Sequence, residues 1–127
     1  MNAVIFSSGK YDHVRLEQKK INFAPIWQRP MNLKLIPING YEISYLDQGE
    51  GFPVIFVHGS LSDYRSWGDQ TDYFSRKYRT IVLNLRHSYP EIWDGKGDCF
   101  SIRQHVEDLS EFIKALNIGP VYLVNCF

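Results

Sequence analysis

The sequence contains few cysteines, no excess of charge of either sign and no long apolar run, and each shortage excludes a class of protein. Its two cysteines, Cys99 and Cys126, form neither a metal-binding spacing nor a disulfide framework. The 14 lysines and arginines balance 14 aspartates and glutamates, which disfavours a binder of nucleic acid or of a membrane surface. No stretch approaches the roughly 20 apolar residues of a membrane-spanning helix. We therefore expect a soluble cytoplasmic protein that acts on a small molecule, with no metal or organic cofactor.

The chain divides into a short leader and one domain. Its 127 residues suffice for one globular domain and are too few for two. Residues 1–31 mix charge with isolated aromatics and include Pro25 and Pro30, which disfavour helix interiors and central strands. We expect residues 1–31 to form a loosely packed arm and residues 32–127 to form the domain.

The domain begins with an alternating pattern of side chains, which is followed by continuous apolar runs. The side chains of residues 33–46 alternate on both sides of the turn signal Asn39-Gly40, and this pattern predicts a β-hairpin. Continuous apolar runs of the kind that form strands buried on both faces follow at 54–57, 81–83 and 121–124.

Two helical segments are predicted between these strands. In the clearer one, Ser101 and Gln104 form a capping box, and apolar residues recur at three- and four-residue spacing at Ile102, Val106, Leu109, Phe112, Ile113 and Leu116. The weaker one covers 67–77, with Ser66 as its cap and Trp67, Tyr73 and Phe74 facing inward. The order predicts an α/β fold in which a hairpin precedes a parallel βαβαβ unit, with ligand sites beyond the carboxyl ends of the strands.

The residues after the strand at 54–57 suggest a family. They are His58, Gly59, Ser60 and Leu61, and an apolar strand that ends in His-Gly resembles the α/β-hydrolases. In that family the loop after this strand donates one backbone N–H to the oxyanion hole. The resemblance, which covers about residues 33–124, implies that Ser60 is at the donor position. It implies a hydrolase of an ester, amide or related bond.

The last strand departs from the family pattern. In the family it runs into Gly-x-Ser-x-Gly, the turn that presents the nucleophile, whereas here Asn125, Cys126 and Phe127 follow. Direct counting puts Phe127 at the nucleophile position, and allowing one deletion puts Cys126 there, which makes Cys126 a weak nucleophile candidate. The family's acid and histidine would come later. We therefore expect an N-terminal part of the fold, inactive alone, with an unpaired edge on its last strand.

Other polar and aromatic residues leave alternatives open. We favour a structural role for His58, whose ring would bond the surrounding loops, over proton transfer. Four side chains, those of Tyr64, Trp67, His87 and Trp93, could line a substrate pocket. Core packing is an equal alternative for the aromatic ones, and a solvated loop is the favoured alternative for His87. His105 and Asp108 are expected to form a surface pair on their helix.

Two other functions remain open from the sequence. A second chain could supply the nucleophile, acid and histidine and pair along the exposed strand edge, which would make a split enzyme. Alternatively, the chain could be a non-catalytic interaction protein that binds a partner or itself through that edge.

Overall fold

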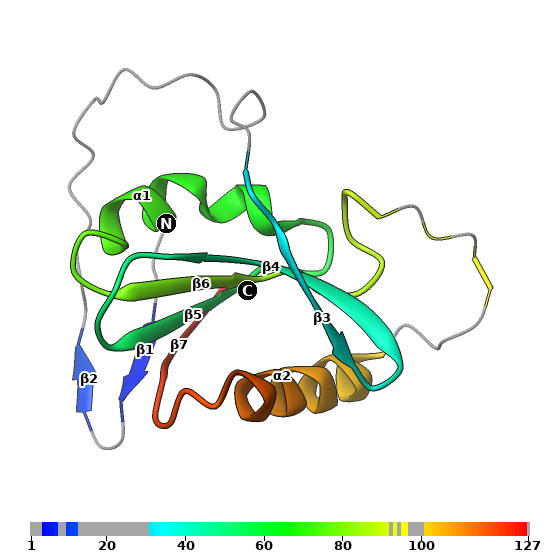
Figure 1. Ribbon diagram of the computed structural model, residues 1–127. Helices are drawn as coiled ribbons and strands as arrows, with labels where there is room; N and C mark the ends of the chain where they lie inside the picture. The colour runs from blue at the N-terminus through cyan, green and yellow to red at the C-terminus, as the bar shows by residue number, and fades with distance from the viewer. Residues whose placement is uncertain are drawn as a thin grey trace.

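The computed structural model describes residues 4–7, 10–12, 31–91, 93, 95–96 and 101–126 (Figure 1). Its strands form one seven-stranded sheet in the order β2-β1-β7-β5-β6-β4-β3. Figure 1 shows α1 above this sheet and α2 below it. The elements in chain order are β1 (Val4–Ser7), β2 (Lys10–Asp12), β3 (Lys34–Ile38), β4 (Tyr41–Gln48), β5 (Pro53–Val57), a 3₁₀ turn (Tyr64–Trp67), α1 (Gly68–Phe74), β6 (Arg79–Leu83), α2 (Ile102–Leu116) and β7 (Tyr122–Asn125).

The predicted α/β fold is confirmed. Strands β3 and β4 pair antiparallel across Asn39 and Gly40, whose φ angles of 49° and 73° suit the type I′ turn that a tight hairpin favours. Strand β5 pairs parallel with both β6 and β7, as expected for strands joined by helical crossovers. The carboxyl ends of these three parallel strands therefore lie at one edge of the sheet.

The core has one layer on each face of the sheet. On the α2 face, Phe112 packs among buried residues of the hairpin and the parallel strands. On the α1 face, Phe56 and Trp67 pack with side chains from β4, β6 and β7. Both faces of β5 are therefore covered, which explains why its sequence is apolar at every position.

The helix α2 lies where predicted, but the prediction of its buried face is wrong at its first turns. Ile102 and Val106 are 83% and 60% exposed, whereas the polar Asp108 is buried with Phe112. The spacing rule placed Ile102 and Val106 in the core because it counts only apolar residues. The rule therefore does not predict that a carboxylate is buried when it forms an ion pair.

The capping of α2 follows half of the predicted box. The hydroxyl of Ser101 accepts a hydrogen bond from the N–H of Gln104 at 3.1 Å. The side chain of Gln104 does not return to the helix start. It donates to Asp108 one turn later, at 3.0 Å. The Gln104 amide thus donates to a buried carboxylate, a charge-assisted hydrogen bond.

The weaker helix is shorter than predicted. It begins with the 3₁₀ turn, whose cap is Asp63 rather than Ser66, and α1 ends at Phe74. The carboxylate of Asp63 accepts from the N–H of Arg65 at 2.9 Å. Trp67 is buried as expected, whereas Tyr73 is 59% exposed and not inward.

The outer edge of β7, which the sequence led us to expect unpaired, is paired in the structure. Strand β1 runs antiparallel to it, with Val4 opposite Asn125, Ile5 opposite Val124 and Phe6 opposite Leu123. Strand β2 pairs with the far side of β1. Pro25 and Pro30, on which the prediction of an arm depends, lie outside the described residues.

Candidate active-site loop

The loop after β5 forms a tight turn at the carboxyl edge of the sheet. The N–H of Ser62 donates to the carbonyl of Gly59 at 3.1 Å, which makes Ser60 and Leu61 the two central residues of a β-turn. Leu61 is fully exposed. Within the described part of the chain, the N–H of Ser60 has no hydrogen-bond acceptor. It is therefore available to an outside acceptor.

The imidazole of His58 holds this turn against the neighbouring strand. Its side chain is buried, and its Nε2 accepts a hydrogen bond from the N–H of Leu85 at 3.0 Å. Nδ1 lies 2.9 Å from the carbonyl of Gly59. Because Nε2 accepts, the proton of the neutral ring must be on Nδ1, which donates to that carbonyl. Burial lowers the pKa of His58, which favours this neutral form.

A second tie between the β5 and β6 loops is the amide of Asn84. Its Oδ1 accepts from the N–H of Tyr64 at 3.2 Å. Its Nδ2 donates to the hydroxyl of Ser44 at 3.0 Å and to the carbonyl of Tyr89 at 2.9 Å. The guanidinium of Arg65 lies 3.9 Å from the centre of the Tyr89 ring, a cation–π contact. The turn is thus held by contacts within the described residues.

Cys126 lies beside this turn. Val57 and Asn125 are register partners at the ends of β5 and β7, and the N–H of Cys126 lies 3.4 Å from the carbonyl of Val57. A Cβ placed on Gly59 would lie 3.5 Å from the carbonyl of Cys126, an ordinary van der Waals distance. The structure therefore brings the predicted oxyanion loop and the weak nucleophile candidate together.

The four predicted pocket residues belong to two separate environments. Tyr64 and Trp67 are buried in the core on the α1 face, and Trp67 packs against Phe56. The rings of His87 and Trp93 pack against each other, with centres 4.8 Å apart, and Tyr41 contacts the edge of His87. Contact of any of them with a substrate remains a prediction.

No family model matches the chain, but curated proteins and solved structures do. It is 34% identical over 90 residues to a non-heme chloroperoxidase of Kitasatospora aureofaciens, covering 68% of this chain and 31% of that protein. Over 89 residues it is 29% identical to (E)-2-((N-methylformamido)methylene)succinate hydrolase of Acinetobacter baylyi, covering 67% of this chain and 32% of that protein.

The solved structures agree with these relatives. An epoxide hydrolase from Vigna radiata matches with a TM-score of 0.64 and 28% identity, covering 73% of this chain and 31% of that one. The Bacillus megaterium epoxide hydrolase matches with a TM-score of 0.63 and 28% identity, covering 71% of this chain and 32% of that one. The chain has the fold of the N-terminal part of an α/β-hydrolase. It spans about a third of the length of the relatives it matches.

The strongest electrostatic feature of this α/β-hydrolase part was missed from the sequence. Asp108 is buried, so the expected surface location of its pair with His105 is wrong. Its carboxylate is buried and accepts from Arg86 at 2.6 and 2.9 Å and from Asn39 at 2.8 Å. Burial raises the pKa of Asp108, but the hydrogen bonds from Arg86, Asn39 and Gln104 outweigh it and leave the pKa below its ordinary value. The sequence feature that could have indicated this buried pair is an aspartate on the apolar face of a helix.

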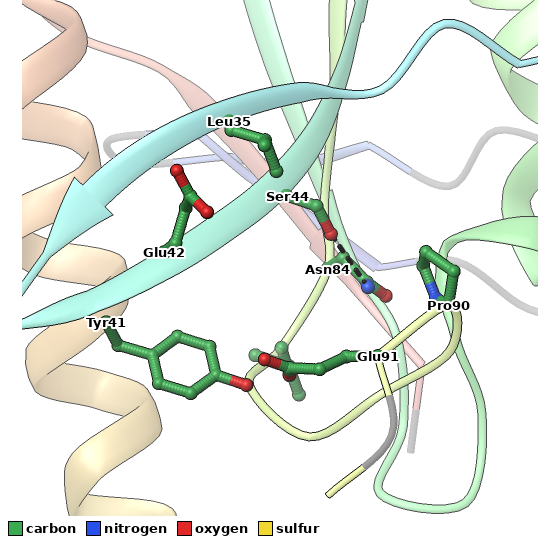
Figure 2. A pocket seen from close by; sticks show the side chains of 8 residues that line it. Leu35, Tyr41, Glu42, Ser44, Asn84, Pro90 and Glu91 are labelled. Carbon is green, nitrogen blue, oxygen red and sulfur yellow. Dashed lines mark hydrogen bonds between the residues drawn. The ribbon is translucent and has the colours of Figure 1, made fainter.

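A cavity that the sequence did not predict lies on the hairpin side of the α/β-hydrolase sheet (Figure 2). Its volume is about 190 Å³, and it is lined by Leu35, Tyr41, Glu42, Ser44, Asn84, Leu85, Pro90 and Glu91. Figure 2 shows the hydroxyl end of Tyr41 directed toward the carboxylate of Glu91. Both groups already bond the N–H of His87, each at 2.9 Å.

Among the described residues, no three His, Cys, Asp or Glu side chains are grouped closely enough to hold a metal ion. In the same part of the chain, no helix has the length and apolar character needed to cross a membrane.

Proposed function

We propose that this chain supplies the oxyanion loop of a hydrolase that cleaves an ester, amide or related bond in a small organic molecule. The observation that carries the proposal is the free N–H of Ser60, held in a turn at the carboxyl end of β5 and beside the end of β7. In acyl transfer, negative charge develops on the carbonyl oxygen of the substrate as the tetrahedral intermediate forms. A donor that is already positioned stabilises this charge without reorganisation, and is worth about 10²–10³ in kcat.

The positioning of the donor supports this role. His58 anchors the carbonyl of Gly59 from one side, and the Asn84 amide anchors the loop at Tyr64 from the other. The family uses a second N–H, from the residue after the nucleophile, and β7 ends next to the turn where that group would be needed.

The catalytic groups are a separate part of the proposal. We propose that residues 1–127 do not hydrolyse a substrate by themselves and that the nucleophile, acid and catalytic histidine come from outside them. His58 cannot serve Cys126 as a base without breaking its own two hydrogen bonds, because both ring nitrogens are engaged. Nucleophilic catalysis by a cysteine needs a base and a group that orients the base.

The relatives support a small organic substrate. Two of the curated relatives are named as hydrolases of organic acids, a substituted succinate and a substituted hexadienoic acid, and a third, from Caenorhabditis elegans, is named epoxide hydrolase 2. The specific substrate of the protein to which this chain belongs is set by residues that approach the loop from elsewhere in the fold.

A chimera tests the proposal. Residues 32–124 would replace the matching segment of the Acinetobacter hydrolase, and the purified chimera would be assayed for hydrolysis of (E)-2-((N-methylformamido)methylene)succinate against the parent protein. We expect the chimera to retain hydrolysis of this substrate at a measurable fraction of the parent's rate. A chimera with a native circular dichroism spectrum and no turnover would contradict the proposal.

A further inference from the structure

The buried ion pair of Arg86 and Asp108 joins three parts of the fold. The guanidinium of Arg86, in the loop after β6, donates to both carboxylate oxygens of Asp108 on α2, at 2.6 and 2.9 Å. From the turn between β3 and β4, Asn39 donates to the same carboxylate at 2.8 Å. The guanidinium also lies 4.5 Å from the centre of the Tyr41 ring. The direction of the Arg86 side chain is therefore set by α2 and by the hairpin.

Stability alone does not require two charges at this place. Both lose their hydration when they are buried, and apolar residues of similar volume often stabilise a fold as well or better. Apolar residues do not provide direction, whereas the planar fork of a guanidinium meets a carboxylate in a defined geometry. The pair therefore suits a task in which the position of the neighbouring backbone matters.

The backbone on the far side of Arg86 is fixed as well. His87 has a φ of 65°, in the left-handed region. Its N–H is bound by the hydroxyl of Tyr41 and by the carboxylate of Glu91, each at 2.9 Å. A residue other than glycine keeps this conformation only where its surroundings impose it. The backbone that carries the N–H of Leu85 is therefore held by the next two residues along the chain.

The N–H of Leu85 links this segment to the oxyanion turn. It donates to Nε2 of the buried His58 ring at 3.0 Å, and Nδ1 of that ring donates to the carbonyl of Gly59, 2.9 Å away. The same carbonyl accepts the N–H of Ser62, which closes the turn around Ser60. A continuous series of hydrogen bonds thus runs from the loop after β6 to the turn that carries the donor.

We propose that Arg86 and Asp108 are positioning residues for the oxyanion donor. They act through Leu85 and His58 on the N–H of Ser60. The inference rests on the proposed function, which gives that N–H a reaction to serve. A donor stabilises the oxyanion only when it points at the place where the charge develops, and a misplacement of about 1 Å can cost about 10²-fold in rate. The ion pair therefore affects kcat and leaves KM nearly unchanged.

The test compares two aspartates in the active chimera that carries residues 32–124. Asp108→Asn removes the negative charge with little change of shape. Asp47→Asn is the matched control, because Asp47 accepts from Arg79 at 3.0 and 2.9 Å at the opposite, amino-terminal end of β6. Each variant is made with and without Ser60→Pro, and kcat and KM are measured for all of them.

We expect Asp108→Asn to lower kcat about 10- to 100-fold with KM nearly unchanged, and Asp47→Asn to leave kcat near the parent value. In the Ser60→Pro background, Asp108→Asn should lower kcat no further, because the donor that the ion pair positions is already absent. A fall of equal size in both backgrounds, or no fall, would overturn the inference and leave the proposed function standing. If Ser60→Pro itself leaves kcat unchanged, the proposed function fails and this inference fails with it.

The 127-residue chain gives a second measurement that needs no activity, for the case in which Asp108→Asn does not fold. Arg86→Lys keeps the positive charge and loses the planar fork. In long-range ¹H–¹⁵N spectra at pH 7, we expect the Nε2 resonance of His58 to move toward that of a nitrogen without a donor. The same substitution at Arg79 should leave this resonance in place. An unmoved Nε2 resonance in Arg86→Lys would overturn the inference.

Discussion

Removing the carboxylate of Asp108 should cost a large part of the stability of this chain. The ion pair with Arg86 is buried on both sides, with side chains 2% exposed, and Asp108 also accepts from Asn39 and Gln104. Asp108→Ala would leave the guanidinium of Arg86 buried without its partner. Breaking a buried pair in this way costs about 3–5 kcal/mol, against a total stability of about 5–15 kcal/mol for a domain. Urea unfolding at pH 7, followed by circular dichroism, measures the loss.

Replacing both members of the pair by apolar residues separates the broken ion pair from the burial of charge. Arg86→Met combined with Asp108→Leu should lose less stability than Asp108→Ala, because the desolvation cost of both charges is removed together. The exposed pair of Arg103 and Glu107 on the same helix is the matched control, with side chains 88% and 52% exposed. Glu107→Ala should cost less than about 0.5 kcal/mol.

The free energy of unfolding that Asp108 contributes should decrease at acid pH. The pKa of Asp108 in the fold lies below its ordinary value of 3.8, so the unfolded chain binds the proton more readily. The stability from this carboxylate is therefore present above pH 3.8 and is lost as the pH falls through the lower folded pKa. If Asp108→Ala costs less than about 1 kcal/mol, or if its loss is equal at neutral and acid pH, the ion pair does not hold these elements together.

Three further predictions concern the loop and the turns. The pKa of His58 is lowered by burial, so its contribution to stability is present above pH 6.5 and is lost as the pH falls through its folded pKa. Long-range ¹H–¹⁵N spectra should show the ring proton of His58 on Nδ1 at pH 7. A proton on Nε2 would contradict the hydrogen bond from the N–H of Leu85. Gly49→Ala should cost more than about 2 kcal/mol in urea unfolding, because φ is +77° and the new Cβ would clash with the carbonyl of Ser75, whereas a loss within error would refute the strain. The 127-residue chain should hydrolyse p-nitrophenyl acetate no faster than its Cys126→Ser variant, and a rate that falls with this change would establish Cys126 as a nucleophile.

The sheet could be predicted because its signals are local. The Asn39-Gly40 turn fixes a hairpin by the φ angles that its residues accept, and continuous apolar runs fix strands that are covered on both faces. The position of the loop after β5 follows from the same logic, since residues at the ends of adjacent parallel strands must meet.

The remaining features depend on contacts between distant residues. In the sequence, Arg86 and Asp108 look like ordinary surface charges, but the fold buries both. Ile102 and Val106 look like core residues, but the position of the helix on the sheet leaves both exposed. The pairing of β1 with β7 joins the two ends of the printed sequence, and no local pattern predicts such a partner. The expectations of a cytoplasmic location and of inactivity alone stay predictions.

The donor role of Ser60 is tested most directly by comparing Ser60→Pro with Ser60→Ala in the active chimera. Proline removes both the N–H and the hydroxyl and suits the second position of the turn that Gly59 and Ser62 close, whereas alanine keeps the N–H and removes only the hydroxyl. The account predicts that kcat falls by about 10²–10³ for proline and stays near the parent value for alanine. Equal kcat in the two variants would show that this N–H does not stabilise the oxyanion.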